Sequence, residues 1–207
     1  MTRELSFLVL KEMSGWARRT ERSGRTPTID EQANWLSKRS GVRVPGGAIG
    51  AGLDRLLLKA GILAAPGARR ALRLLRDAGV PVGVVSNVLH QTSDGAREVL
   101  ERTRIAEFFR SVTLSSDIPW AKPRPEPFLR CLADLGVEPA GAAHIGDLSL
   151  DVEGARRAGM QPLLYTGLHR CEPARDRPLF NRIDGRVRRV RSWSELPGFF
   201  DPRSSRR

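Results

Sequence analysis

Cysteine, lysine and long apolar runs are all scarce in this sequence, and these shortages exclude several classes of protein. The two cysteines, Cys131 and Cys171, do not form a close metal-type pair. No apolar run approaches the roughly 20 residues of a membrane span. Residues 1–15 carry charged side chains and lack a signal-peptide pattern. We therefore expect no membrane insertion and predict a cytoplasmic protein whose thiols stay reduced.

Negative charge is also in short supply, since the formal net charge is +12 over 207 residues. Arginine is densest at residues 186–191 and 203–207. This balance permits binding to nucleic acid. However, the chain shows no zinc spacing, no interleaving of aromatic and basic residues, and no recognisable DNA-binding helix. We expect no specific nucleic-acid partner, and a basic nucleic-acid-binding module is the third of three function hypotheses.

Apolar periodicity and turn residues divide the chain into a helical first part and an alternating second part. A helical region is predicted at residues 1–62, an α/β region at 63–200 and a basic tail at 201–207. The predicted helices are 4–20, 29–40, 48–60, 66–78, 93–104, 125–135 and 150–158, and the predicted strands are 81–86, 111–115, 142–146, 162–165 and 187–190. This alternation indicates an α/β fold with a largely parallel, doubly wound sheet.

Two carboxylates follow the predicted strand 142–146. Asp147 stands at the end of that strand, where ligands bind in open α/β sheets. Asp151 lies four residues further on, at the start of a helix. Carboxylates placed in this way suit a hard cation such as Mg²⁺, although Gly146-Asp147 alone is also typical of a turn with a helix cap.

A hydroxyl, an amide and an ammonium stand in two other loops. Ser86 and Asn87 end an apolar strand, where they can hold a phosphate oxygen or cap a helix. Lys122 lies in a proline-rich loop before a helix, and its compact charge suits a contact with a phosphate or a carboxylate. His90, just past Asn87, is a candidate for facing a substrate, whereas His144 is expected to be a half-buried strand residue.

In order and spacing these segments resemble the motifs of the haloacid dehalogenase-like (HAD) hydrolase superfamily. The resemblance implies a Rossmann-like core, a small helical cap at residues 1–62, a Mg²⁺ ion, and attack by an aspartate on a small phosphorylated substrate. It implies phosphate binding by Ser86, Asn87 and Lys122, with Lys122 as the catalytic lysine. Asp147 is expected to bind the metal, and Asp151 to bind or orient it.

The sequence departs from the family pattern at its first motif, a strand that ends in Asp-x-Asp. No Asp-x-Asp occurs before Ser86. Either the chain is shortened at its N-terminus, or a degenerate strand survives at residues 6–10 with Lys11 in the nucleophile position. The spacing of Leu5, Leu8 and Val9 favours a helix, and therefore the first alternative. In the family the missing strand lies between those that carry Ser86 and Asp147.

Two hypotheses about function therefore rank above nucleic-acid binding. The first is a Mg²⁺-dependent phosphatase of the HAD type, with a dehalogenase as its variant. The second is a non-catalytic HAD-like protein that binds a ligand or a partner. Because the nucleophile motif is absent, we expect little or no turnover from the chain as it stands. The sequence leaves the oligomeric state open.

Overall fold

A computed structural model describes residues 3–167 and 187–200. The predicted basic tail 201–207, His169 and Cys171 lie outside these residues. The elements, in chain order, are α1 (Arg3–Arg22), α2 (Ile29–Ser40), α3 (Ala48–Lys59), α4 (Ala68–Asp77), β1 (Gly83–Ser86), α5 (Ser93–Arg102), η1 (Ala106–Phe108), β2 (Ser111–Leu114), α6 (Glu126–Leu135), η2 (Pro139–Gly141), β3 (Ala143–Gly146), α7 (Ser149–Arg157), β4 (Gln161–Tyr165), β5 (Arg188–Val190) and η3 (Trp193–Phe199).

The predicted helices and strands are confirmed, most of them to within two residues at each end. Local signals explain this accuracy. Thr28 caps α2, because its side chain accepts a hydrogen bond from the backbone N–H of Glu31 while the Glu31 carboxylate binds the N–H of Thr28. Gly79, with φ of +71°, follows α4 and turns the chain toward β1.

The strands form two parallel groups and not one continuous sheet. β1 pairs with β2, with Gly83 opposite Ser111. β3 pairs with β4 and β4 with β5, so the second group has the order β3-β4-β5. Within the described residues, no strand joins β1 to β3. The predicted parallel α/β class is therefore confirmed, and the single sheet that the alternation suggested is interrupted between the strands that carry Ser86 and Gly146.

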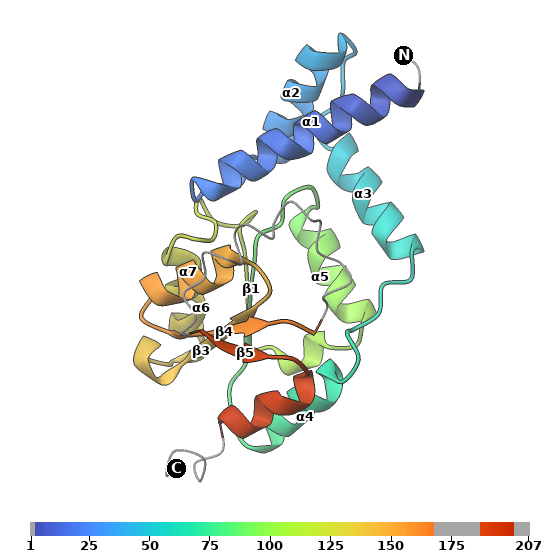
Figure 1. Cartoon of the computed structure of the whole chain (residues 1–207). Coiled ribbons are helices and arrows are strands. Elements are labelled where there is room, and N and C mark those ends of the chain that lie inside the picture. The colour runs from blue at the N-terminus through green and yellow to red at the C-terminus, as the bar shows by residue number, and fades with distance from the viewer. Residues whose placement is uncertain (1–2, 168–186, 201–207) are drawn as a thin grey trace.

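Helices cover both faces of the strands (Figure 1). On one face, Phe128 of α6 and Ala155 of α7 pack with Val85 of β1. On the other face, Leu75 of α4 and Leu196 of η3 belong to a cluster that includes Val82, just before β1, and residues of β3, β4 and β5. The segment of β1 contributes Val85 to the first cluster and the preceding Val82 to the second, so this segment shares a layered core with β3, β4 and β5.

The first three helices gather at one end of the molecule, beyond the strands (Figure 1). Residues 6–10 lie inside α1, so the alternative in which they form a degenerate strand is wrong. Trp16 of α1 stacks on Trp35 of α2, with ring centroids 5.9 Å apart. The Asp54 carboxylate of α3 accepts a 2.6 Å hydrogen bond from the Thr92 hydroxyl at the start of α5, which joins this helical region to the core. No helix in the described part combines the length and the apolar character that crossing a bilayer needs.

Candidate functional site

Lys122 stands at the centre of the polar side chains near the carboxyl ends of β1 and β3. Its Nζ lies 2.7 Å from Asp151 Oδ1 and donates a 3.0 Å hydrogen bond to the Val85 carbonyl. The side chains of Lys122 and Asp151 are only 11% and 4% exposed, so this ion pair is buried. An ammonium has three N–H donors, and these two contacts leave one of them for a further acceptor.

Asp151 is held as a carboxylate by its surroundings. Its Oδ2 accepts a 2.9 Å hydrogen bond from the Leu148 N–H, and the His144 ring lies 3.3 Å from Oδ1. Burial alone would raise the pKa of Asp151, but the Lys122 charge and the His144 contact outweigh it and hold that pKa well below its ordinary value. Asp151 therefore stays ionised and fixes the lysine in place.

Asn87 fixes the backbone of the lysine loop. Its Nδ2 donates to the Lys122 carbonyl at 3.1 Å, and its Oδ1 accepts from the Lys122 N–H at 2.9 Å. This two-way contact locks the position from which the lysine side chain extends. Ser86 ends β1, and its hydroxyl has no hydrogen-bond partner among the described residues. Asn87 thus serves the site through Lys122, while the Ser86 hydroxyl is available to a ligand.

Two further titratable side chains lie where the helical region meets the loop after β1. Glu21, near the end of α1, lies close enough to Asn87 to interact with it. Burial raises its pKa, and the contacts with Asn87 and Lys122 only partly offset that effect. The His90 Nδ1 lies 2.6 Å from the Gln32 Oε1, and burial, with Arg18 adding to it, lowers the pKa of His90. Sequence reasoning missed Glu21, because nothing in a helical segment signals contact with a distant loop.

The described residues do not by themselves make a magnesium site. Asp147 is exposed at the end of β3, whereas both oxygens of Asp151 are already engaged by protein groups. A magnesium site needs near-octahedral oxygen coordination, and the described part of the chain holds no group of three or more His, Cys, Asp or Glu side chains that could bind a metal. In this structure the Asp151 carboxylate acts on Lys122, and its expected role of binding or orienting a metal stays a prediction.

The comparisons with known proteins identify the family. A family model described as haloacid dehalogenase-like hydrolase matches residues 57–164, just over half of the chain. The chain belongs to this family of HAD-like hydrolases, and the resemblance seen in its motifs is confirmed.

Curated relatives include several phosphatases. The chain is 38% identical over 109 residues to haloacid dehalogenase-like hydrolase domain-containing protein 3 of Bos taurus, and that match covers 52% of this chain and 42% of the relative. It is 39% identical over 90 residues to a glyceraldehyde 3-phosphate phosphatase of Methanopyrus kandleri, covering 43% of this chain and 37% of the relative. It is 32% identical over 96 residues to a phosphoglycolate phosphatase of Pseudomonas putida, covering 46% of this chain and 34% of the relative. The matches thus span about two fifths or less of each relative's length.

Solved structures share the fold over nearly the whole chain. A HAD phosphatase from Thermococcus onnurineus superposes with a TM-score of 0.64 at 22% identity, covering 93% of this chain and 78% of that one. The HAD-hydrolase YfnB from Bacillus subtilis gives a TM-score of 0.65 at 20% identity, covering 97% of this chain and 84% of that one. These similarities establish the HAD fold.

Proposed function

We propose that this chain is the phosphate-binding part of a HAD-type phosphatase that acts on a small phosphorylated metabolite. The observation that carries the proposal is the buried Lys122, which Asp151 holds against the carbonyl of Val85, the residue next to Ser86. The third ammonium N–H and the Ser86 hydroxyl have no partner among the described residues, so they supply two donors at the carboxyl end of β1 for a phosphate oxygen. The phosphatase names of several relatives support this substrate class.

The proposal separates phosphate binding from turnover. Covalent phosphoryl transfer needs a nucleophile, and the sequence has no Asp-x-Asp motif before Ser86. In a site completed by further oxygen ligands, Asp147 would supply one carboxylate to Mg²⁺, and Asp151 would keep Lys122 in position. The chain alone should therefore bind phosphate without hydrolysing its esters.

The test joins a binding measurement to an activity assay. Inorganic phosphate is titrated into the protein by NMR, and hydrolysis of an aryl phosphate is followed with and without Mg²⁺. We expect phosphate binding that weakens about tenfold or more in Lys122→Met and several-fold in Ser86→Ala, since charged hydrogen bonds outweigh neutral ones. The matched control is Lys38→Met, which removes the same charge at an exposed position.

Two results would contradict the proposal. Phosphate binding that is absent, or equal in the wild-type protein and in Ser86→Ala and Lys122→Met, removes the phosphate site. Mg²⁺-dependent hydrolysis that Asp147→Asn abolishes shows that another residue of the chain acts as the nucleophile.

The second candidate function is non-catalytic binding of a ligand or partner through the same site. The engagement of both Asp151 oxygens by protein groups favours it, because a carboxylate used in this way is not free to ligate a metal. The same assay separates the two candidates when the protein is extended by an Asp-x-Asp strand, because binding without hydrolysis in that extended protein would select the non-catalytic function.

A further inference from the structure

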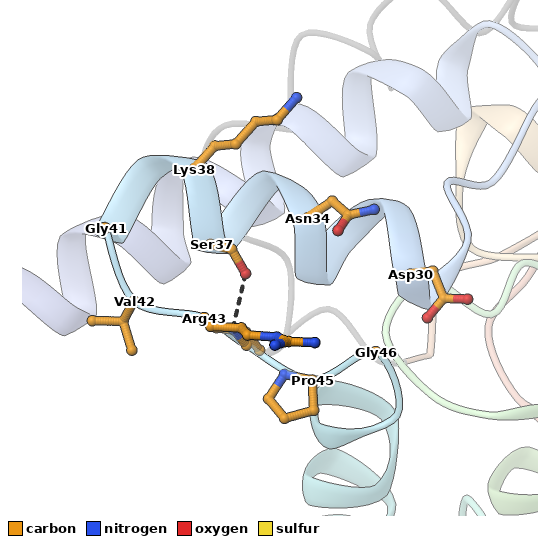
Figure 2. A pocket seen from close by; sticks show the side chains of 10 residues that line it. Asp30, Asn34, Ser37, Lys38, Gly41, Val42, Arg43, Pro45 and Gly46 are labelled. Atoms are coloured by element: carbon orange, nitrogen blue, oxygen red, sulfur yellow. Dashed lines mark hydrogen bonds between the residues drawn. The ribbon is translucent and has the colours of Figure 1, made fainter.

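The largest hollow on the described part of the molecule, of about 850 Å³, is formed by α2 and the loop after it. Figure 2 shows Arg43 lying along this hollow and Lys38 pointing away from it. The Ser37 hydroxyl in its wall already donates to the Ala33 carbonyl and accepts from the Val44 N–H. Nothing in this wall points to a ligand, and a denser group of charges lies at the other end of the molecule.

Helix α4 divides into a buried apolar side and an exposed arginine side. Its buried residues are Ala68, Ala71, Leu72 and Leu75. Its exposed positions include four arginines, which we call the α4 arginine face: Arg69, Arg70, Arg73 and Arg76. The helix lies at the end of the molecule opposite α1 and α2 (Figure 1). It leads into the amino end of β1, whereas Lys122 lies near the carboxyl end of that strand, so this face is separate from the phosphate site.

Acidic side chains neutralise only part of the α4 arginine face. Glu107 of η1 is shared between two arginines, since it lies 3.1 Å from Arg69 and 3.8 Å from Arg76. Arg70 and Arg73 are exposed and have no ion pair among the described residues. Both of these guanidinium groups are therefore open to an anion from outside the chain.

The surroundings of α4 add further positive charge. β5 and η3 pack with α4 in one apolar cluster. Nine arginines stand against three acidic residues in the segments that contain α4, η1, β5 and η3, which are residues 66–80, 104–110 and 187–200. Arg188 lies over the Phe199 ring at 4.0 Å, and Arg76, which also lies 3.6 Å from Asp77, is 4.9 Å from the centre of the Phe108 ring. A ring contact engages the flat face of a guanidinium and leaves its N–H edge for a phosphate.

The stability of α4 does not explain this distribution of charge. Its first turn holds Arg69 and Arg70 and no acidic residue, although the helix dipole favours negative charge there. Arg73 is three or four residues from each of the other three arginines, and like charges at such spacings repel one another. A row of negative charges supplied from outside would relieve both effects.

A polymer of closely spaced phosphates fits this row better than a membrane does. Between Arg69 and Arg76 the helix rises by about 10 Å, and a nucleic acid duplex presents about six negative charges over that length. The forked guanidinium matches a phosphate in two hydrogen bonds. Binding of a helix at a membrane surface also needs exposed apolar side chains, and Leu74 is the one large apolar residue of α4 that is exposed.

We propose that the α4 arginine face binds the phosphate backbone of a nucleic acid duplex, without regard to base sequence. Arg70 and Arg73 would make the main contacts, because no carboxylate of the described residues competes for them. Phosphate contacts carry no sequence information, so this proposal agrees with the expectation of no specific nucleic-acid partner. It is also independent of the phosphate chemistry at Lys122.

Fluorescence anisotropy of the full chain with two labelled DNA duplexes of unrelated sequence tests the proposal. We expect both to bind, with affinity that falls steeply between about 50 and 200 mM salt. Arg70→Gln combined with Arg73→Gln should weaken binding about tenfold or more and reduce the slope of log affinity against log salt by about 2, since each phosphate contact contributes about 0.9. The matched control, Arg43→Gln combined with Arg55→Gln, removes the same charge from exposed arginines of the helical region and should keep the wild-type slope.

Four results overturn the proposal: no binding of either duplex at about 50 mM salt, equal losses in the two double variants, affinities for the two duplexes that differ more than about tenfold, or tighter binding to phosphatidylserine vesicles than to either duplex. Circular dichroism confirms that each variant is folded. If the Arg70 and Arg73 double variant does not fold, the single variants Arg70→Gln and Arg73→Gln decide, each with an expected slope change of about 1. All of these variants should bind inorganic phosphate at the Ser86 site as the wild type does, so this proposal and the proposed function fail separately.

Discussion

At the residue scale, the site depends on one buried ion pair. Charges are costly to bury unless they are paired and hydrogen-bonded. Lys122 and Asp151 meet that condition, since each has a second partner: Val85 for the lysine and Leu148 for the aspartate. The pair is therefore sensitive to the loss of either member.

Replacing Lys122 should reverse the sign of the change in protein stability that acidification causes. In the wild-type protein the pKa of Asp151 is depressed. Its contribution to the free energy of unfolding is therefore complete above about pH 4, the ordinary pKa of Asp. That contribution is lost as the pH falls toward the depressed pKa of the folded protein. Lys122→Met should lower the free energy of unfolding at pH 7 by about 3–5 kcal/mol. Because burial of an unpaired carboxylate raises its pKa, that deficit should shrink on acidification.

Urea unfolding at several pH values measures both effects. Arg130→Ala is the control, because it breaks an ion pair with Asp134 that is largely exposed and should cost less than about 1 kcal/mol. A deficit of Lys122→Met that stays constant between pH 7 and pH 4 would show that Asp151 does not carry the effect.

At the element scale, close approach between helices depends on small residues. Gly154 of α7 lies against the Phe128 ring of α6, and a Cβ at this position would come within 2.3 Å of the ring. Phe128 is fully buried and also meets the His144 ring edge to face, at a centroid distance of 4.8 Å. The packing of α6 on α7 therefore positions the histidine that contacts Asp151.

Two glycine substitutions should have opposite effects on stability. Gly154→Ala forces the phenylalanine to move and should cost about 1–3 kcal/mol. Gly52→Ala in α3 has no atom within 4 Å of the added methyl, so it should stabilise the protein by about 0.5–1 kcal/mol through helix propensity. Thermal unfolding measures both, and a Gly154→Ala variant as stable as the wild type would contradict the packing argument.

Local elements were the predictable part of this structure. Proline, glycine and capping residues indicated where helices begin and end, as at Thr28 and Gly79. The contacts of Glu21 with Asn87 and of His144 with Phe128 could not be predicted, because both join segments far apart in sequence. The individual motifs identified Lys122, Ser86 and Asp147 as candidate site residues. Nothing in the motifs predicted that the Asn87 side chain would bind the backbone of Lys122.

At the scale of the whole molecule, the interruption between β1 and β3 is the dominant feature. Alternate residues of a strand point their peptide groups to opposite sides. The peptide group of Ser86 faces β2, since its carbonyl accepts from Ser115. The peptide groups of Gly83 and Val85 therefore face the interruption, where Lys122 binds the Val85 carbonyl. Open strand edges of this kind favour association.

Amide hydrogen exchange should therefore alternate along β1. We expect slow exchange at Val84, which faces β2, and fast exchange at Gly83 and Val85. Size-exclusion chromatography over a range of concentrations should show self-association or low stability, since unpaired backbone groups are costly inside a core. Slow exchange at all three residues in a stable monomer would mean that another segment already fills the position between β1 and β3.

The burial of Lys122 also affects how the chain reacts with reagents that acylate amines. Lys11, Lys38 and Lys59 are exposed, whereas the amine of Lys122 is enclosed and hydrogen-bonded. Acylation proceeds through the free amine, so the three exposed lysines react first and the fourth is spared while the fold holds. The pattern of acylated lysines therefore reports, in a single mass spectrum, whether the lysine loop is assembled.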